Sequence, residues 1–263
     1  MKRVFVLFLL IHWGTHFSQN TKINVAATNI QSFESDTFIG YDALDNIYYL
    51  KDGALIKRKD AQTWQYKNIN LGKVTFVDIQ NPLKIILFYE GFNTAISLDS
   101  QLNEIQKINF SDVNPPLVVS ALGLASQNRF WLYNSLTQQI GLFDFMKNTF
   151  LPLSTPFKES LKYYQSDFNH FQWIDQKLNW YSCDVYGKVT SLGEIPNFDA
   201  IQIVDNRTFL LKIGNQLFWY DLEKNKSYSI ENIASSYSNF YYKNKTLTLS
   251  NSSGLSNYKI DIP

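Results

Sequence analysis

Leu55-Ile56-Lys57-Arg58-Lys59-Asp60 is a short stretch with apolar residues near its start and an aspartate at its end, and the sequence repeats this phrase six times. The other copies are Ile96-Ser97-Leu98-Asp99, Gly141-Leu142-Phe143-Asp144, Trp180-Tyr181-Ser182-Cys183-Asp184, Phe218-Trp219-Tyr220-Asp221 and Tyr258-Lys259-Ile260-Asp261. The intervals between the aspartates are 39, 45, 40, 37 and 40 residues. A period near 40 built from short strands is typical of propeller blades. The sequence therefore predicts an all-β domain, a six-bladed β-propeller.

Each blade is expected to hold four strands, named A to D from the axis outward. Lys51-Asp52-Gly53 separates strands B and C of the first blade, and Asp-Gly between two alternating runs marks a tight hairpin. The fourth blade can be drawn in two registers, and the stretch Pro152–Ser160 before it is expected to be a linker with one helical turn. The sixth blade lacks an outer strand. We expect Lys22–Ala27 to close the ring beside Tyr258–Asp261, because an open blade would leave strand edges unpaired.

Two sets of aspartates recur at the predicted turns. The first set ends strand C in each blade and consists of Asp60, Asp99, Asp144, Asp184, Asp221 and Asp261. The second set lies at the turn between strands A and B and consists of Asp42, Asp78, Asp167 and Asp205. Short polar side chains bond the backbone of turns, so we interpret both sets as structural. Calcium binding is the alternative, but it requires several carboxylates on one ion, and these aspartates are spread over six blades.

The N-terminus has the pattern of a secretory signal peptide. Lys2 and Arg3 precede the apolar run Val4–Ile11, and the following polar stretch contains Phe17-Ser18-Gln19, which resembles the end of signal peptides from Bacteroidetes-type bacteria. The alternative is a membrane-spanning helix, which needs about 20 apolar residues, and this run offers about half that. We expect residues 1–18 to be cleaved and residues 19–263 to form the single domain. The protein is then exported through the secretory pathway and is periplasmic or extracellular, with no membrane span after cleavage.

Composition restricts the partners and the chemistry. The chain has 24 Lys+Arg against 23 Asp+Glu, so no positive field indicates a nucleic acid or an anionic membrane. Cys183 is the single cysteine, which excludes an internal disulfide, and its apolar neighbours indicate a buried, inert thiol. Because the last predicted strand comes directly before the end of the chain, we expect no appended anchoring domain. We also expect no cofactor, and a monomer.

Catalytic motifs are missing from the sequence. His170 is the one histidine left after signal cleavage, because His12 and His16 lie in the signal segment, and it falls in an alternating strand. Sequence order alone leaves a Ser-His-Asp triad open, but no nucleophile elbow, P-loop or Gly-x-Gly-x-x-Gly appears. We therefore predict no catalytic, cofactor-binding or metal-ligating residue, and no enzymatic activity.

The blade pattern also carries a resemblance. Phe38-Ile39-Gly40-Tyr41-Asp42, with Asn46–Leu50 and Ile56–Asp60, resembles six-bladed propellers of the NHL and TolB-like kind, as found among uncharacterised exported propeller proteins of Bacteroidetes type. The resemblance implies a ring with a central channel whose mouths carry the connecting loops. Propellers of this kind bind proteins, peptides or sugars, and some are enzymes, so the resemblance alone does not assign a function.

Two functions follow from these observations. The first is a non-enzymatic binding or assembly module of the cell envelope with a protein partner, which the export signal and the missing catalytic motifs favour. The alternative is a carbohydrate-binding or carbohydrate-active protein with a site at the channel mouth. Trp64 and Phe92 are the aromatic residues that we expect on such a ligand face.

Overall fold

The computed structural model describes residues 21–32 and 34–261. The predicted signal peptide, residues 1–18, lies outside the described residues. Within them the helical segments are three short 3-10 turns, and none has the length and apolar character of a membrane-crossing helix.

The described chain is built almost entirely of strands. In chain order they are β1 (Thr21–Asn24), β2 (Ala26–Ser32), β3 (Thr37–Tyr41), β4 (Ile47–Lys51), β5 (Ala54–Lys59), β6 (Gln62–Tyr66), β7 (Phe76–Asn81), β8 (Lys84–Tyr89), β9 (Thr94–Leu98), β10 (Glu104–Asn109), β11 (Val119–Ala125), β12 (Arg129–Asn134), β13 (Gln139–Asp144), β14 (Thr149–Pro152), β15 (Leu161–Ser166), β16 (His170–Asp175), β17 (Asn179–Asp184), β18 (Val189–Glu194), β19 (Ala200–Ile203), β20 (Thr208–Ile213), β21 (Gln216–Asp221), β22 (Lys226–Glu231), β23 (Asn239–Lys243), β24 (Thr246–Asn251) and β25 (Gly254–Lys259). The 3-10 turns are η1 (Ile69–Leu71), η2 (Glu90–Phe92) and η3 (Phe110–Asp112).

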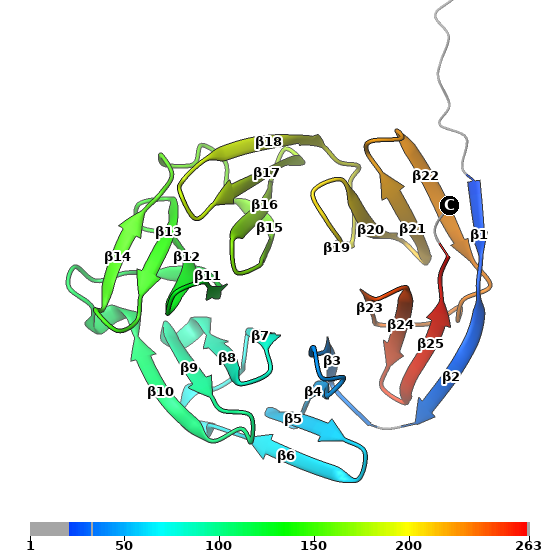
Figure 1. The fold of residues 1–263 in the computed structure, drawn as a ribbon, viewed down its shortest axis with the longest axis horizontal. Coiled ribbons are helices and arrows are strands. Elements are labelled where there is room, and N and C mark those ends of the chain that lie inside the picture. Colours follow the sequence, from blue (N-terminus) through cyan, green and yellow to red (C-terminus); the bar gives the residue numbers. More distant parts are fainter. Residues whose placement is uncertain (1–20, 33, 262–263) are drawn as a thin grey trace, which may run out of the picture.

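The strands form six antiparallel blades around a central axis, which confirms the predicted six-bladed propeller (Figure 1). Blades 1 to 5 are β3–β6, β7–β10, β11–β14, β15–β18 and β19–β22, each with its first strand innermost. The fourth blade has the register obtained by aligning Asp184 with Asp221. The connection after Pro152 contains no helical turn, so that detail of the prediction was wrong.

The N-terminal strands close the ring. Blade 6 consists of β23, β24 and β25, and β2 pairs antiparallel with β25 as its outer strand. Figure 1 shows these N-terminal strands beside the C-terminal ones. Closure by an N-terminal strand is therefore confirmed, but the closing strand is Ala26–Ser32 and not Lys22–Ala27. The segment β1 instead pairs parallel with β22 and adds a fifth strand to blade 5. The alternating apolar residues of this segment explain its place. Ile23 and Val25 lie on one side of the strand and are buried in the cluster between blades 5 and 6.

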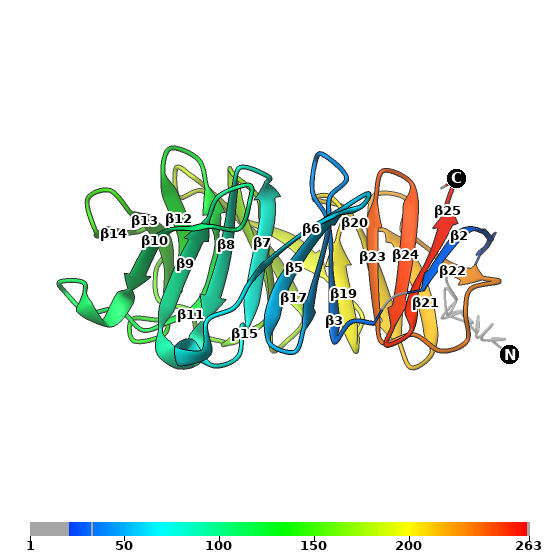
Figure 2. The same ribbon diagram turned by 90° about the horizontal axis from the view of Figure 1, so that it is seen from below.

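Alternating connections place the turns on two faces of the disc, which Figure 2 shows edge-on. Because all strands within a blade run antiparallel, the A–B and C–D turns lie on one face, and the B–C turns and the links between blades lie on the other. The blade faces pack on their neighbours. Between blades 3 and 4, Trp131 and Ile140 meet Phe171 and Trp173 in one apolar cluster. The junctions 1–2, 2–3, 4–5 and 5–6 also hold buried apolar side chains from both blades.

Candidate functional site

Five of the aspartates that end strand C lie in the C–D turns, on the outer half of the blades, whereas the sixth, Asp261, follows β25, whose outer partner β2 comes from the N-terminus. Asp99, Asp144, Asp184 and Asp221 each accept hydrogen bonds from backbone N–H groups two to four residues later in the turn. Asp60 occupies a left-handed conformation with φ 50°. Asp261 lies two residues after β25 and is exposed. The six carboxylates remain in separate blades and do not converge on one point.

Within the second set of aspartates, Asp42, Asp167 and Asp205 lie in the A–B turns, whereas Asp78 lies inside strand β7, where it pairs with Ile86, and not in the turn where the sequence pattern placed it. Asp167 and Asp205 accept N–H bonds within their own turns and lie near the surface. Asp42 and Asp78 are different, because only 1% and 4% of their surfaces are exposed. Asp42 accepts bonds from two backbone N–H groups of its turn, from the Asn46 side chain and from the Tyr48 hydroxyl.

A five-residue turn recurs that the sequence analysis did not identify. An aspartate accepts the backbone N–H groups two and four residues later, and its second oxygen accepts the side-chain amide of an asparagine four residues later. The pairs are Asp42–Asn46, Asp99–Asn103 and Asp175–Asn179, and the residue before each asparagine has a positive φ between 59° and 70°. The spacing Asp-x-x-x-Asn was the available signal, and it would have added Asp175 to the structural aspartates.

One position on the innermost strand is equivalent in all six blades by strand register, and we call these six residues the inner ring. In each blade we take the strand C residue two positions before the repeated aspartate, then its partner on strand B, then that residue's partner on strand A. The strand A residues found in this way are Tyr41, Asp78, Gly123, Gln165, Gln202 and Lys243. Gln165 and Gln202 both lie 19 residues before that aspartate, so the repeat in the sequence could have identified this pair.

Side chains of this inner ring join neighbouring blades. The Gln165 amide donates to the Ile203 carbonyl at 2.8 Å and accepts the Ile203 N–H at 3.1 Å. Gln202 makes the same pair of hydrogen bonds: its amide donates to the Tyr242 carbonyl at 2.8 Å and accepts the Tyr242 N–H at 2.7 Å. The Asp78 carboxylate accepts the N–H of Leu124 in blade 3, at 2.7 Å. Most polar groups of the inner ring are therefore occupied by the backbone of the next blade.

An axial cavity of about 830 Å³ lies inside the ring, within the usual size of ligand pockets. Its aromatic lining comes from Tyr41, Phe76, Tyr163, Tyr164, Phe168, Phe240 and Tyr241. Blade 3 contributes no lining residue among those that the structure describes. The rings of Phe76 and Tyr164 meet 5.6 Å apart in front of it, and a Cβ at Gly123 would overlap the Ser166 hydroxyl. Blade 3 is thus covered, and the cavity opens toward the other five blades.

Asp78 is, with Asp42, one of two buried carboxylates in the cavity wall. Its oxygens accept the Leu124 N–H and two bonds from Gln80, which favour the ionised form. No cation contacts it among the described residues, and burial raises the pKa of the Asp78 carboxyl above its usual range. The group is therefore able to hold a proton at a pH at which exposed aspartates are ionised.

The other candidate residues lie away from this cavity. Trp64 is half-buried on the outer strand of blade 1, with the Lys57 ammonium 5.0 Å from the centre of its ring. Phe92 is 52% exposed in η2, on the face that carries the B–C turns. His170 begins β16 beside Asp167, with its Nδ1 3.4 Å from Oδ2. Cys183 is buried, and burial raises the pKa of its thiol to about 11. Among the described residues, no three His, Cys, Asp or Glu side chains form a group that could hold a metal ion.

Comparison with known proteins gives similarity at the level of fold. No protein-family model and no curated protein sequence matches the chain. Virginiamycin B lyase from Staphylococcus aureus superposes with a TM-score of 0.58 at 9% identity, covering 91% of this chain and 95% of the lyase. A structural genomics protein of unknown function from Bacteroides thetaiotaomicron gives 0.58 at 12% identity, covering 92% and 75%. The extracellular domain of a putative hybrid two-component system from B. thetaiotaomicron gives 0.52 at 9% identity, covering 92% and 40%.

These similarities confirm the expected kind of protein and correct one prediction. Extracellular and uncharacterised propellers of Bacteroides are among the proteins that share the fold, as the sequence resemblance implied. The prediction that the protein is not an enzyme is overturned, because virginiamycin B lyase is an enzyme with the same propeller fold. Residues distant in sequence meet around a propeller axis, so the lack of local motifs does not exclude a catalytic site. The chain is a six-bladed β-propeller, a fold that it shares with the lyase and with the two B. thetaiotaomicron proteins.

Proposed function

We propose that the protein is an exported binding module that captures an apolar peptide segment of a partner protein in its axial cavity. One observation carries this proposal: the cavity has an aromatic lining, while most of its polar side chains already make hydrogen bonds within the protein. A ligand in this cavity meets mainly carbon atoms, which suits leucine or phenylalanine side chains better than the hydroxyl groups of a sugar.

Phe168 is the lining residue best placed to meet the ligand first. It lies in the A–B turn of blade 4 and is 38% exposed, which is high for a phenylalanine next to a cavity. Burial of a phenylalanine side chain contributes about 1.5–3 kcal/mol. A ligand that covers the exposed part of Phe168 therefore gains binding free energy from burying its ring.

Selection of peptides from a phage-displayed library on the mature chain tests the proposal, with affinities measured by isothermal titration calorimetry. We expect peptides rich in aromatic and aliphatic residues, and we expect Phe168→Ala to weaken their binding about tenfold. Phe92→Ala is the matched control, because Phe92 is also exposed but lies outside the cavity. If no peptide is selected, or if Phe92→Ala weakens binding and Phe168→Ala does not, the axial cavity is not the binding site.

A further inference from the structure

The junction between blades 6 and 1 lacks the shared apolar core of the other junctions. Its hydrophobic cluster consists of Tyr49, Ala54 and Ile56 with Ile47 packed against them, and all four belong to blade 1. The two blades are joined at their inner edge by hydrogen bonds and by the Tyr241 ring, whose centre lies 5.9 Å from the Phe38 ring and 6.2 Å from the Tyr41 ring. Asn239 donates to the Phe38 carbonyl, and the Tyr241 hydroxyl donates to the Tyr41 carbonyl, both at 3.1 Å.

The polar character comes from the face that blade 6 turns toward blade 1. Strand β24 reads Thr246-Leu247-Thr248-Leu249-Ser250, with leucines in the cluster shared with blade 5 and hydroxyl groups on the opposite face. Asn257 lies directly across from Thr248 on the same face. Leu255, across from Ser250, is the aliphatic residue on this face. By contrast, strand B of blade 2, Ile85–Tyr89, is apolar on both faces.

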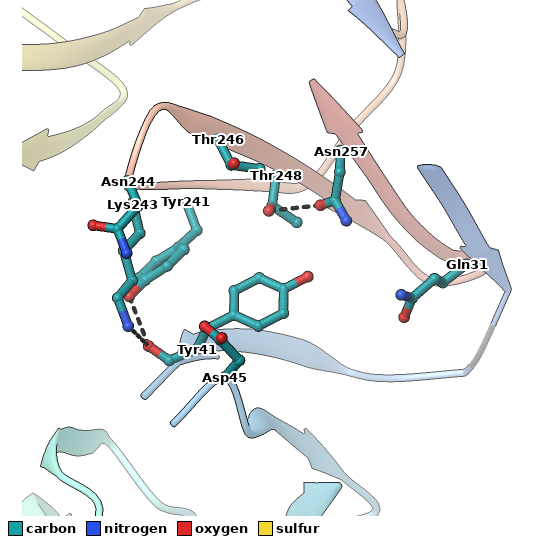
Figure 3. Close-up of a pocket in the computed structure, with 9 residues that line it drawn as sticks. All are labelled: Gln31, Tyr41, Asp45, Tyr241, Lys243, Asn244, Thr246, Thr248 and Asn257. Atoms are coloured by element: carbon teal, nitrogen blue, oxygen red, sulfur yellow. Dashed lines mark hydrogen bonds between the residues drawn. The ribbon is translucent and has the colours of Figure 1, made fainter. Parts of the chain in front are cut away.

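A second cavity, which we call the seam cavity, results from this mismatch. It has a volume of about 240 Å³ and is lined by Gln31, Tyr41, Asp45, Tyr241, Lys243, Asn244, Thr246, Thr248 and Asn257. At about 30 Å³ per water molecule in the liquid, this is room for roughly eight waters or for one sugar ring. Figure 3 shows the Tyr41 and Tyr241 rings on one side and the hydroxyl and amide side chains of blade 6 on the other.

Several lining groups have unused hydrogen-bonding capacity. The Tyr41 hydroxyl is buried without a hydrogen-bond partner in the described structure, and in Figure 3 it points between Asn257 and Gln31. The amide nitrogens of these two side chains are also available, because their oxygens accept from Thr248 and Arg58. No hydrogen bond involves the Thr246 hydroxyl within residues 21–32 and 34–261. A buried polar group without a partner carries a desolvation cost that a ligand can remove.

We propose that the seam cavity binds one neutral sugar unit, either free or at the end of a glycan. Hydroxyl and amide groups from four strands surround the space, and the tyrosine rings offer an apolar surface for the carbon-bound hydrogens of a sugar ring. The Lys243 ammonium keeps its charge, but two of its three N–H groups already donate to the carbonyls of Tyr41 and Asp42, which leaves one N–H group for a ligand. The carboxylate of Asp45, which is exposed, disfavours an anionic sugar.

This site adjoins the proposed peptide site, but the two can be tested separately. Tyr41, Tyr241 and Lys243 line both cavities, but the remaining seam residues lie in blade 6 and in the A–B turn of blade 1. Phe168 is not among the seam residues. Phe168→Ala is therefore expected to leave sugar binding unchanged. Peptide binding by the mature chain without sugar binding, or the reverse, shows which of the two proposals has failed.

The test uses D-glucose, D-galactose and D-mannose, each as the free sugar and as its methyl glycoside, with binding to the mature chain followed by saturation-transfer NMR and calorimetry. We expect at least one of them to bind with a dissociation constant tighter than roughly 10 mM. We expect glucuronate to bind more weakly than glucose. Preference for the methyl glycoside would identify a terminal glycan unit as the ligand, and preference for the free sugar would identify a monosaccharide.

Two conservative variants locate the site. Tyr41→Phe and Thr246→Val remove hydroxyl groups that have no described partner, so folding is retained, and each is expected to weaken sugar binding about fivefold. Tyr237→Phe is the matched control, because its hydroxyl is also buried without a partner but lies between blades 5 and 6. The proposal is overturned if none of the sugars binds, or if Tyr41→Phe and Tyr237→Phe bind the sugar equally well.

Discussion

Two junctions of the propeller differ in polarity. The junction between blades 3 and 4 is apolar, and the junction between blades 6 and 1 is polar on the blade 6 side. In the first, buried aromatic residues come from both sides, and the Phe171 ring lies 6.0 Å from Trp131 and 5.6 Å from Tyr164. In the second, blade 6 presents hydroxyl and amide groups, and hydrogen bonds hold the inner edge. Apolar packing between two complete blades tolerates no cavity, whereas the polar junction leaves one. The ring beside this junction is completed by the N-terminal strands β1 and β2, which pair with β22 and β25.

The largest effect is expected from removal of those strands. Deleting residues 21–32 exposes the edges of β22 and β25 and removes the buried Ile23 and Val25 side chains, each contributing about 1.5–3 kcal/mol. Domains are stable by only about 5–15 kcal/mol, so we expect loss of cooperative thermal unfolding, measured by circular dichroism. Ile30→Ser, on β2 but 72% exposed, is the control and should change stability by about 0.5 kcal/mol at most. An unchanged melting curve after the deletion would show that the ring does not need this closure.

A matched pair of alanine variants compares the two junctions directly. Phe171→Ala removes a fully buried ring and should lower the free energy of unfolding by about 3–5 kcal/mol. Asn257→Ala removes a 2.7 Å hydrogen bond from Thr248 at the edge of the seam cavity and should cost about 1 kcal/mol. Urea unfolding measures both. Equal losses would mean that the seam is packed as firmly as the other junctions.

Much of the fold was predictable from local patterns. Alternating strands, the Asp52-Gly53 turn and the aspartate period determine the six blades, because each blade is a local unit of hairpins. Two features were not predictable in this way. The alternation from Lys22 to Ala27 is continuous, so it does not show where the chain passes from blade 5 to blade 6. Phe76 and Tyr164 meet across blade 3, and sequence spacing does not place residues from different blades together. The Thr-Leu alternation in β24 was the unused signal for the seam.

A third prediction makes the seam resemble the other junctions. Thr248→Val combined with Asn257→Leu replaces both partners of the Thr248–Asn257 hydrogen bond by apolar groups, so no buried donor is left unpaired. The new side chains border the seam cavity together with Tyr41 of blade 1. We expect the free energy of unfolding to rise by up to about 1 kcal/mol, measured by urea unfolding. A loss larger than that would show that the polar pair itself holds the two blades together.

The smallest effect concerns charge at a junction that is otherwise apolar. In blade 2, Asp78 is buried against blade 3 and Asp99 lies in the C–D turn, so one blade carries both environments. Burial raises the pKa of Asp78 above 3.8, whereas bonds from the Asn103 side chain and backbone lower the pKa of Asp99 below it. A group whose pKa is raised on folding stabilises the fold fully below its unfolded pKa, and this contribution is lost as the pH rises through the folded value. Asp99 acts in the opposite direction, and its contribution is lost as the pH falls through its folded pKa.

Carboxyl NMR titration should therefore find a higher pKa for Asp78 than for Asp99. The reverse order would mean that the three N–H donors around Asp78 outweigh its burial, and that charge is accommodated at the apolar junctions as readily as on the surface.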